Sequence, residues 1–202
     1  MRILLDNSHG LNLATPGKQS PLWPDIPHLL EWRWTREMVE RIRDKLIQAR
    51  IPTHRLVPEY KDIPLWERCA RANQLAKNYG ISNCLLVSIH VNTSKTGTAQ
   101  GWEIHTGKDQ TLSAVFARYF WNHATTTLPS VTNMRSNHSD ADPDWDSNYA
   151  ILRDTQCPSV LTQNLFIDNY EDCKFLLSEH GKVTIADLHV NAIKQITQVF
   201  NR

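Results

Sequence analysis

Short apolar runs alternate along the chain with segments whose apolar residues recur at helical spacing. Near-continuous apolar runs predict strands buried on both faces, and their alternation with helices is typical of an α/β domain. We therefore predict a three-layer α/β fold, in which a central, mostly parallel, twisted sheet is flanked by helices. The predicted strands are residues 2–6, 53–57, 84–90, 101–106, 149–153 and 159–162.

Amphipathic periodicity predicts the helices that flank this sheet. Pro64 and Gly80 mark the two ends of the second helix, as expected from the preference for Pro at helix starts and Gly after helix ends. The apolar run 101–106 is expected to pair with the central run 84–90. The predicted helices are residues 31–49, 64–79, 112–123 and 180–200.

Two long polar segments, residues 10–27 and 125–148, are expected to wall a groove beside the strand ends. The second contains alternating aspartates that superficially resemble a calcium loop. It lacks the Gly at position six and the Glu at position twelve that such loops require, so we interpret it as a solvated loop. The aspartates are Asp140, Asp142, Asp144 and Asp146.

Length and composition restrict the class of protein. A chain of 202 residues with 41% hydrophobic residues predicts one domain, residues 1–202. The formal charge of +1 offers no basic surface for nucleic acid. The first ten residues are too polar for a signal peptide or a membrane span. The four cysteines are widely spaced, which argues against a zinc knuckle or redox pair and favours buried free thiols. We expect a monomer.

Two histidines follow apolar runs at predicted strand ends, where ligand sites of open α/β sheets gather. His9 follows residues 2–6, and His90 ends the run 84–90. Together with Glu31, at the start of a helix, they form the N, N, O set that catalytic zinc uses. Glu37 is a competing acid on the same helix, but six residues on it points to a different face.

Five blocks, in order, resemble the zinc-dependent N-acetylmuramoyl-L-alanine amidases that cut peptidoglycan. The resemblance runs from Ile3 to about Leu177. The first block departs slightly, having "DNSHG" where many members have a Pro-Gly-His-Gly-Gly run. The blocks are "ILLDNSHG", the helix that opens at Glu31, "ERCARAN" with "LLVSIHVN", "GWEIHT", and "NYAILRDTQCPSVLTQNLFIDN".

The resemblance implies one zinc ion held by His9, Glu31 and His90, and hydrolysis of the amide between the lactyl group of N-acetylmuramic acid and L-alanine. In the family a glutamate on the last strand takes the proton of the attacking water and delivers it to the leaving amine. Gln163 stands at that position here. Asn92, Arg153 and Asn164 are expected to bind substrate, and His28 and His138 are further candidates for the groove.

An amide at position 163 cannot serve as a base, and loss of a general acid/base costs typically ~10²–10⁴-fold in rate. Three explanations stay open for Gln163. It was introduced to hold uncleaved substrate, it is native to a non-catalytic muropeptide-binding module, or another acid has taken over. A zinc peptidase that cuts within the stem peptide is a further alternative, because its metal chemistry would be the same.

The resemblance places the activity in the cell wall or periplasm. A leaderless single domain fits a phage lysin, and it equally fits a bacterial amidase from which the signal peptide has been removed. The expected partner is peptidoglycan or a muropeptide, with no nucleic acid and no membrane span.

Overall fold

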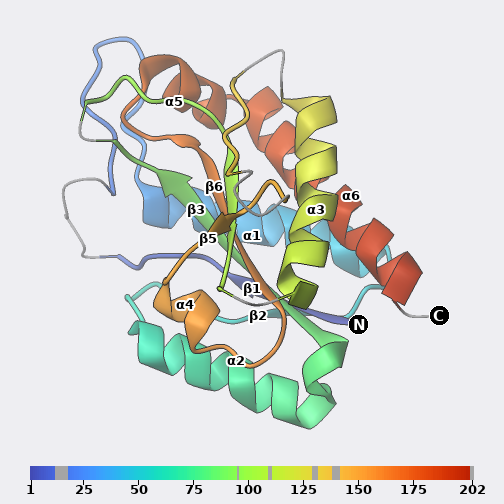
Figure 1. Cartoon of the computed structure of the whole chain (residues 1–202). Helices are drawn as coiled ribbons and strands as arrows, with labels where there is room; N and C mark the ends of the chain where they lie inside the picture. The colour runs from blue at the N-terminus through green and yellow to red at the C-terminus, as the bar shows by residue number, and fades with distance from the viewer. Residues whose placement is uncertain (12–17, 95, 109–110, 129–131, 138–141, 201–202) are drawn as a thin grey trace.

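The computed structural model describes residues 1–11, 18–94, 96–108, 111–128, 132–137 and 142–200. The strands are β1 (Arg2–Asp6), β2 (Thr53–Arg55), β3 (Cys84–Asn92), β4 (Glu103–Thr106), β5 (Trp145–Asp146) and β6 (Ser159–Phe166). They form one sheet in the order β2-β1-β3-β6-β4-β5 (Figure 1). Neighbouring strands are parallel except β4 and β6, which are antiparallel.

Helices cover both faces of this sheet, so the predicted α/β fold is confirmed (Figure 1). One face packs against α1, α3, α5 and α6, and the other against α2 and α4. A short 3₁₀ helix, Ile81–Asn83, leads into β3. The helices are α1 (Glu31–Gln48), α2 (Leu65–Tyr79), α3 (Thr111–Thr127), α4 (Ala150–Arg153), α5 (Tyr170–Leu177) and α6 (Glu179–Phe200).

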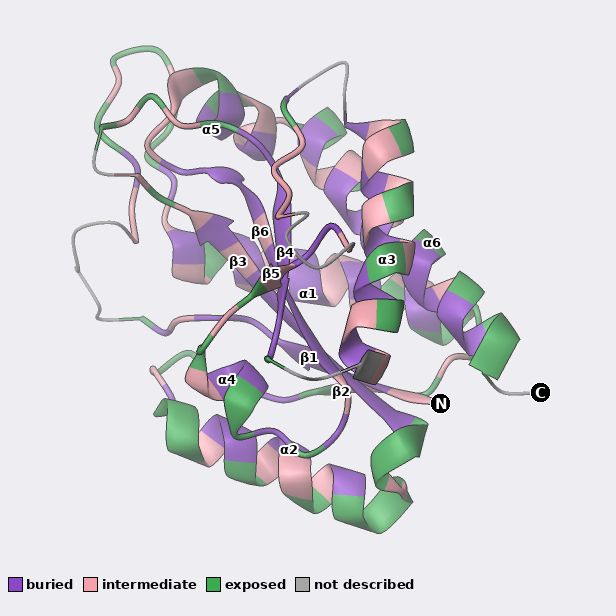
Figure 2. Ribbon diagram, viewed as in Figure 1, coloured by how far each residue is buried: buried purple, intermediate pink, exposed green. Residues whose placement is uncertain are grey.

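The central strands β1, β3, β4 and β6 are largely buried because both faces of the sheet are covered, whereas the edge strands β2 and β5 are partly exposed (Figure 2). Side chains alternate between faces along a strand. In β3, Leu85 and Val87 join the core under α1, whereas Leu86 joins the smaller core under α2 and α4. By the same alternation Ser88 and His90 lie on the face of Leu86. The polar end of β3 therefore continues the α2 and α4 side of the sheet.

The apolar face of α1 is buried as its periodicity predicts. Ile42 is fully buried in the larger core, and Ile47 on the same helix is 49% exposed. We expect Ile42→Ala to lower the free energy of unfolding by ~2–5 kcal/mol, because truncation leaves a cavity. Ile47→Ala is the matched control and should stay within ~0.5 kcal/mol. Denaturant unfolding of both variants checks the helix phase, and equal losses would contradict it.

His189 supplies a second test of the core, because its imidazole is fully buried on α6. Its Nε2 contacts the Thr162 hydroxyl at 2.9 Å, and its Nδ1 contacts the Ile185 carbonyl at 2.8 Å. Burial lowers the pKa of His189 from 6.5 to about 4. The unfolded chain therefore binds this proton first as the pH falls below 6.5.

We expect this group to cost up to about 3 kcal/mol of folding stability as the pH falls from 6.5 to 4, and to cost nothing above 6.5. The variant His189→Gln removes the titrating ring. Its unfolding free energy should therefore fall less than that of the parent over this range. If the unfolding free energies of the parent and of His189→Gln changed equally with pH, His189 would not be the group that titrates.

Two sequence predictions about the sheet are wrong. Residues 149–153 were expected to form a strand, but residues Ala150–Arg153 form α4, which Tyr149 caps through its carbonyl oxygen. Residues 101–106 were expected beside β3, but β4 pairs with β6 instead. A short apolar run has no periodicity that separates strand from helix, and strand order depends on packing far along the chain. The elements β5 and α5 were not predicted.

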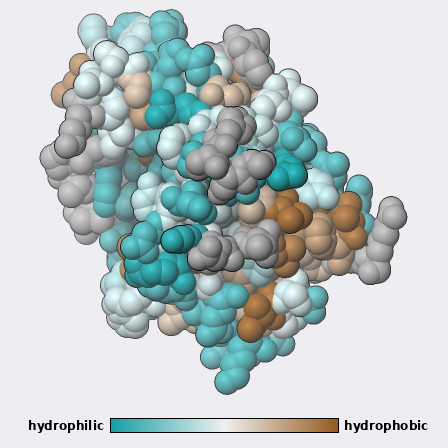
Figure 3. Space-filling model, viewed as in Figure 1, coloured by the Kyte–Doolittle hydropathy of each residue, from teal (hydrophilic) through white to brown (hydrophobic). Residues whose placement is uncertain are grey.

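The surface and the cysteines bear on two further predictions, the absence of a membrane-spanning helix and the buried free thiols. Within the described ranges, no helix has the length and apolar character needed to cross a bilayer. All four cysteines are free and buried, as expected. On the face drawn in Figure 3, apolar atoms gather over α3 and the end of α6, where Val115, Val199 and Phe200 are exposed. The surface around α4 and α2 is mostly hydrophilic.

Candidate metal centre

The three predicted ligands converge at the carboxyl ends of β1 and β3. His9 follows β1, Glu31 is the first residue of α1, and His90 lies near the end of β3. The ligand atoms of these three side chains all lie within 4.8 Å of one another. Glu37 lies apart, paired with Arg41 and Lys182. The fold thus assembles the N, N, O set from residues that are up to 81 positions apart, from 9 to 90.

The spacing of these atoms suits a small tetrahedral ion. His9 Nε2 lies 3.7 Å from one Glu31 oxygen, and His90 Nδ1 lies 3.2 Å from the other. Ligand atoms placed ~2.0–2.2 Å from a tetrahedral zinc are ~3.4 Å apart, which matches both distances. The site therefore fits zinc in donor type and in spacing.

Electrostatics also prepares the site for a cation. Burial lowers the pKa of His9 from 6.5 to about 4, so its ring is neutral and its lone pair available near neutral pH. Burial acts to raise the pKa of Glu31, but the hydrogen bonds from His90 and from the Val91 amide outweigh it, and the pKa lies below its usual value. Glu31 is thus a buried carboxylate, whose charge needs compensation.

Backbone constraints hold His9 in place. Ser8 has a positive φ of 55°, and its hydroxyl lies 3.0 Å from that of Thr35 on α1. The amide of Gly10 donates to Asp62 Oδ1 at 2.7 Å. A Cβ at Gly10 would lie 2.0 Å from the backbone nitrogen of Asp62, so only glycine fits there. Both neighbours of the ligand are therefore fixed.

A buried ion-pair network also supports the loop that carries His9. Arg68 on α2 donates to Asp62 at 2.9 Å and approaches Asp6 at 3.4 Å. Asp6 also accepts from the Ser88 hydroxyl at 2.6 Å, which links β1 to β3. Breaking a buried pair leaves an uncompensated charge, so this network ties α2 to the metal loop.

Gln163 lies directly beside the metal centre. In the sheet register Gln163 pairs with His90 on one side and with Glu103 on the other. Paired residues share a face, so the three side chains form a row across β3, β6 and β4. The buried Gln163 Oε1 has no hydrogen-bond donor among the described residues. An unpartnered buried carbonyl is costly, which marks the place where a ligand group or water would bind.

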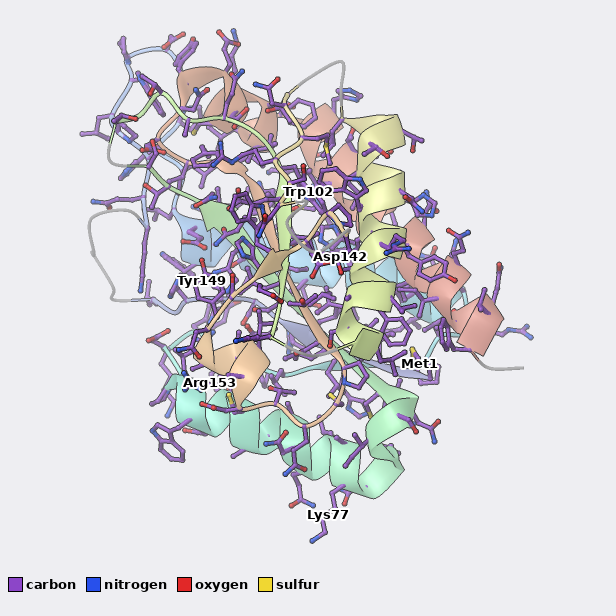
Figure 4. The ribbon with its side chains drawn as sticks, viewed as in Figure 1. Met1, Lys77, Trp102, Asp142, Tyr149 and Arg153 are labelled. Carbon is purple, nitrogen blue, oxygen red and sulfur yellow. The ribbon has the colours of Figure 1, made fainter. Side chains whose placement is uncertain are left out.

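Tyr149, labelled in Figure 4, lies just before α4, and its ring centroid lies 5.3 Å from that of His105 on β4. Burial raises the pKa of its hydroxyl, the charge of Glu103 raises it further, and a hydrogen bond with Gln163 opposes both. The raised pKa keeps the Tyr149 hydroxyl protonated near neutral pH.

Glu103 is buried and has three partners. Its Oε1 lies 2.7 Å from Asn92 Nδ2 and 3.2 Å from His105 Nε2, and its Oε2 accepts from Arg135 Nε at 2.8 Å. Burial acts to raise the pKa of Glu103, but the bonds from His105 and Arg135 outweigh it and lower the pKa. The Glu103 carboxylate therefore stays ionised and remains hydrogen-bonded to its three partners.

The predicted substrate contacts lie in different environments. Asn92 is part of the site, since it bonds Glu103 two residues after His90. Arg153 is exposed at the end of α4 and pairs with Asp154 (Figure 4). Asn164 is fully buried; it accepts from Trp102 Nε1 at 3.0 Å and donates to the His90 carbonyl at 2.9 Å. As substrate contacts all three stay predictions, and the bonds of Asn164 position the His90 strand.

Two loop predictions have separate outcomes. His28 is exposed and bonds the Ser20 carbonyl at 2.8 Å, whereas His138 lies outside the described residues. The aspartate loop was expected to be solvated, but Asp144 is buried and accepts from the Thr106 hydroxyl at 2.6 Å. The prediction is wrong at this position because the loop folds back onto β4. Asp140 also lies outside the described residues.

Comparison with known families decides the assignment. The family model for N-acetylmuramoyl-L-alanine amidase matches residues 3–195, nearly the whole chain. The chain belongs to the N-acetylmuramoyl-L-alanine amidase family. The match spans the metal cluster and Gln163, so the amidase family resemblance seen in the sequence is confirmed. A comparison with curated proteins gave no match.

Solved amidase structures share the fold at low sequence identity. The N-acetylmuramoyl-L-alanine amidase from Clostridium difficile matches with a TM-score of 0.81 and 20% identity over 98% of this chain and 96% of its own. Ami1 from Mycobacterium smegmatis matches with a TM-score of 0.79 and 21% identity over 98% of this chain and 97% of its own. The catalytic domain of the CD27L endolysin, which targets Clostridia difficile, matches with a TM-score of 0.69 and 18% identity over 96% of this chain and 97% of its own. At these identities the matches concern the fold.

Sequence reasoning missed three residues that border the site of this amidase-family chain. Glu103 begins β4, and period-two spacing places it on the face of His105, a signal that the sequence does contain. Tyr149 was assigned to a strand. Arg135 lies in a polar segment without periodicity, so no sequence pattern marks it.

Proposed function

We propose that this chain is a peptidoglycan amidase domain that binds one zinc through His9, Glu31 and His90, and that Gln163 keeps its turnover low. Its substrate is the amide between the lactyl group of N-acetylmuramic acid and L-alanine. The observation that carries the proposal is the register of Gln163 with His90, which puts an amide in the row beside the three ligands.

The residues divide the chemistry between them. A zinc ion would act as a Lewis acid toward a water and the scissile carbonyl. Gln163 can hold a water or the substrate amide by hydrogen bonds, but it can neither accept the proton of the water nor deliver one to the leaving amine. Tyr149 has a raised pKa, so near neutral pH it keeps its proton and can only donate or accept a hydrogen bond.

A relocated acid is disfavoured by the environment of Glu103. This is the carboxylate paired across the sheet with Gln163. Its bonds from Asn92, His105 and Arg135 and its lowered pKa make it a weak base. Since a general base works best with a pKa near the operating pH, Glu103 is better suited to positioning its neighbours.

Product analysis tests the proposed bond. Purified peptidoglycan digested with the Gln163→Glu variant should release stem peptides whose new amino terminus is L-alanine. A zinc peptidase would give new amino termini within the stem, and a binding module would give none. The double variant Gln163→Glu/His90→Ala is the control for metal dependence. New amino termini other than alanine would overturn the assigned bond.

The proposed place of action follows from the substrate. Peptidoglycan amidases act on the cell wall, and we expect this domain to act there or in the periplasm as a monomer, without a nucleic-acid partner. The hydrophilic surface around α2 and α4 in Figure 3 is compatible with a glycopeptide substrate.

A further inference from the structure

Among the described residues, the terminal nitrogens of Arg135 have no acceptor, and Arg135 bonds Glu103 in the row of His90, Gln163 and Glu103. We propose that Arg135 is a specificity-determining residue that binds a carboxylate of the stem peptide. This inference rests on the proposed function and deepens it, because it names the part of the muropeptide that the domain selects. Neither the family match nor the metal cluster assigns a role to this arginine.

The side chain of Arg135 is held in one orientation. Its Nε donates to Glu103 Oε2 at 2.8 Å, and its guanidinium carbon lies 5.2 Å from the centre of the Phe166 ring. Gly101, with φ of +123°, packs against the aliphatic part; a Cβ there would lie 2.9 Å from Arg135 Cγ. Three contacts therefore fix the guanidinium before any ligand binds, which reduces the entropy cost of binding.

Glu103 connects this arginine to the metal centre. It is buried and also bonds Asn92, two residues after His90. It pairs with Gln163 in the sheet. A substrate whose scissile amide lies beside His90 and Gln163 would therefore extend one strand further to reach Arg135. The next residues of the stem peptide can span that distance, since a residue covers up to ~3.3–3.6 Å.

The terminal nitrogens of Arg135 are the available donors. Within the described parts of the chain, only its Nε donates to an acceptor, and the side chain is 39% exposed. A guanidinium with its planar edge free binds carboxylates through two parallel hydrogen bonds. Peptidoglycan stems carry such groups, whereas the lactyl carboxyl is already consumed in the scissile amide. The stem is thus the anionic part of the substrate.

Direct binding measurement tests this inference with the protein as it is, because low turnover leaves the ligand intact. The probes are N-acetylmuramoyl-L-alanyl-D-glutamate and its diamide, titrated into the zinc-loaded chain by calorimetry. We expect the dicarboxylate to bind about ten- to a hundredfold more tightly, the range for hydrogen bonds to a charged group. Arg135→Gln should abolish this preference, and Arg135→Lys should keep part of it.

Two further variants keep the test decisive. Because Arg135→Gln leaves Glu103 without one partner, the double variant Arg135→Gln/Glu103→Gln removes both charges and should also lose the preference. Arg118→Gln makes the same change on the exposed surface of α3 and should keep it. A preference unchanged in Arg135→Gln would overturn this inference alone. If neither the dicarboxylate nor its diamide bound the chain, the proposed substrate would be overturned as well.

Discussion

Gln163→Glu should raise amidase turnover by at least ~10²-fold, and by ~10⁴-fold if one carboxylate serves both proton transfers. The reason is local. Position 163 lies in register with His90, and its buried oxygen lacks a donor among the described residues, so a carboxylate there would face the reacting water without a competing partner. The measurement is the release of amino termini from purified peptidoglycan.

The same surroundings predict the pH dependence of the variant. The side-chain oxygen at position 163 is buried and the negative charge of Glu103 is adjacent in the sheet, and both disfavour a second carboxylate, so the pKa of Glu at position 163 should lie above the usual value for glutamate. The base is active only when ionised. Turnover should therefore rise with pH through that raised pKa, and a profile that is flat from acid to neutral pH would contradict this environment.

Zinc content and a neutral variant serve as controls for Gln163→Glu. The metal keeps its three ligands, so zinc per chain should not change. Gln163→Met, which is of similar length but has no basic atom, should stay at the level of the parent. If Gln163→Glu bound zinc yet left turnover at background, we would adopt the muropeptide-binding module in place of the low-turnover enzyme.

His9→Ala and His90→Ala should each abolish stable zinc binding in the parent chain. Loss of a residue that only supports a ligand costs ~10–100-fold in metal affinity, so loss of a ligand should exceed ~100-fold. The parent should hold about one zinc per chain, the stoichiometry of a single three-ligand site. Metal analysis after dialysis measures this without any activity, so the result does not depend on Gln163.

His28→Ala is the matched control for the two ligand variants, because His28 is exposed and its ring bonds the Ser20 backbone carbonyl, away from the three candidate ligands. Its zinc content should equal that of the parent. Glu31→Gln should also lose zinc, since the buried carboxylate supplies the negative charge of the site. Full zinc retention in both His9→Ala and His90→Ala would place the metal elsewhere.

The predicted elements succeeded where the sequence pattern is long and failed where it is short. The periodic face from Trp34 to Leu46 predicted the phase of α1, and the apolar run 84–90 was correctly predicted as a buried strand, which the structure extends to Asn92. The apolar run of residues 149–153 is too short to show a period. Its helical form depends on backbone hydrogen bonds, in which the amides of Leu152 and Arg153 donate to the Tyr149 carbonyl. Local pattern cannot decide such segments.

The candidate site shows the same division. His9, Glu31 and His90 were recognisable because each stands at the end of an element, and parallel neighbouring strands bring such ends together. Gln163 was recognisable because the sequence block around it resembles the family block that carries the catalytic glutamate. Glu103 and Arg135 were not predicted: period-two spacing shows which face Glu103 shares with His105, but the antiparallel pairing of β4 with β6 and the bond from Arg135 to Glu103 are what bring them to the site.

The sequence by itself determined the α/β class and the three candidate ligands, because these depend on periodicity and on residue type at element ends, and its resemblance to the family singled out the amide at position 163. Only the tertiary structure decided that β4 lies beside β6, that Glu103 is ionised and hydrogen-bonded, and that Arg135 is held by Glu103 with its terminal nitrogens unpaired among the described residues. Strand order and side-chain partners are set by the packing of distant segments, and a local pattern carries no information about them.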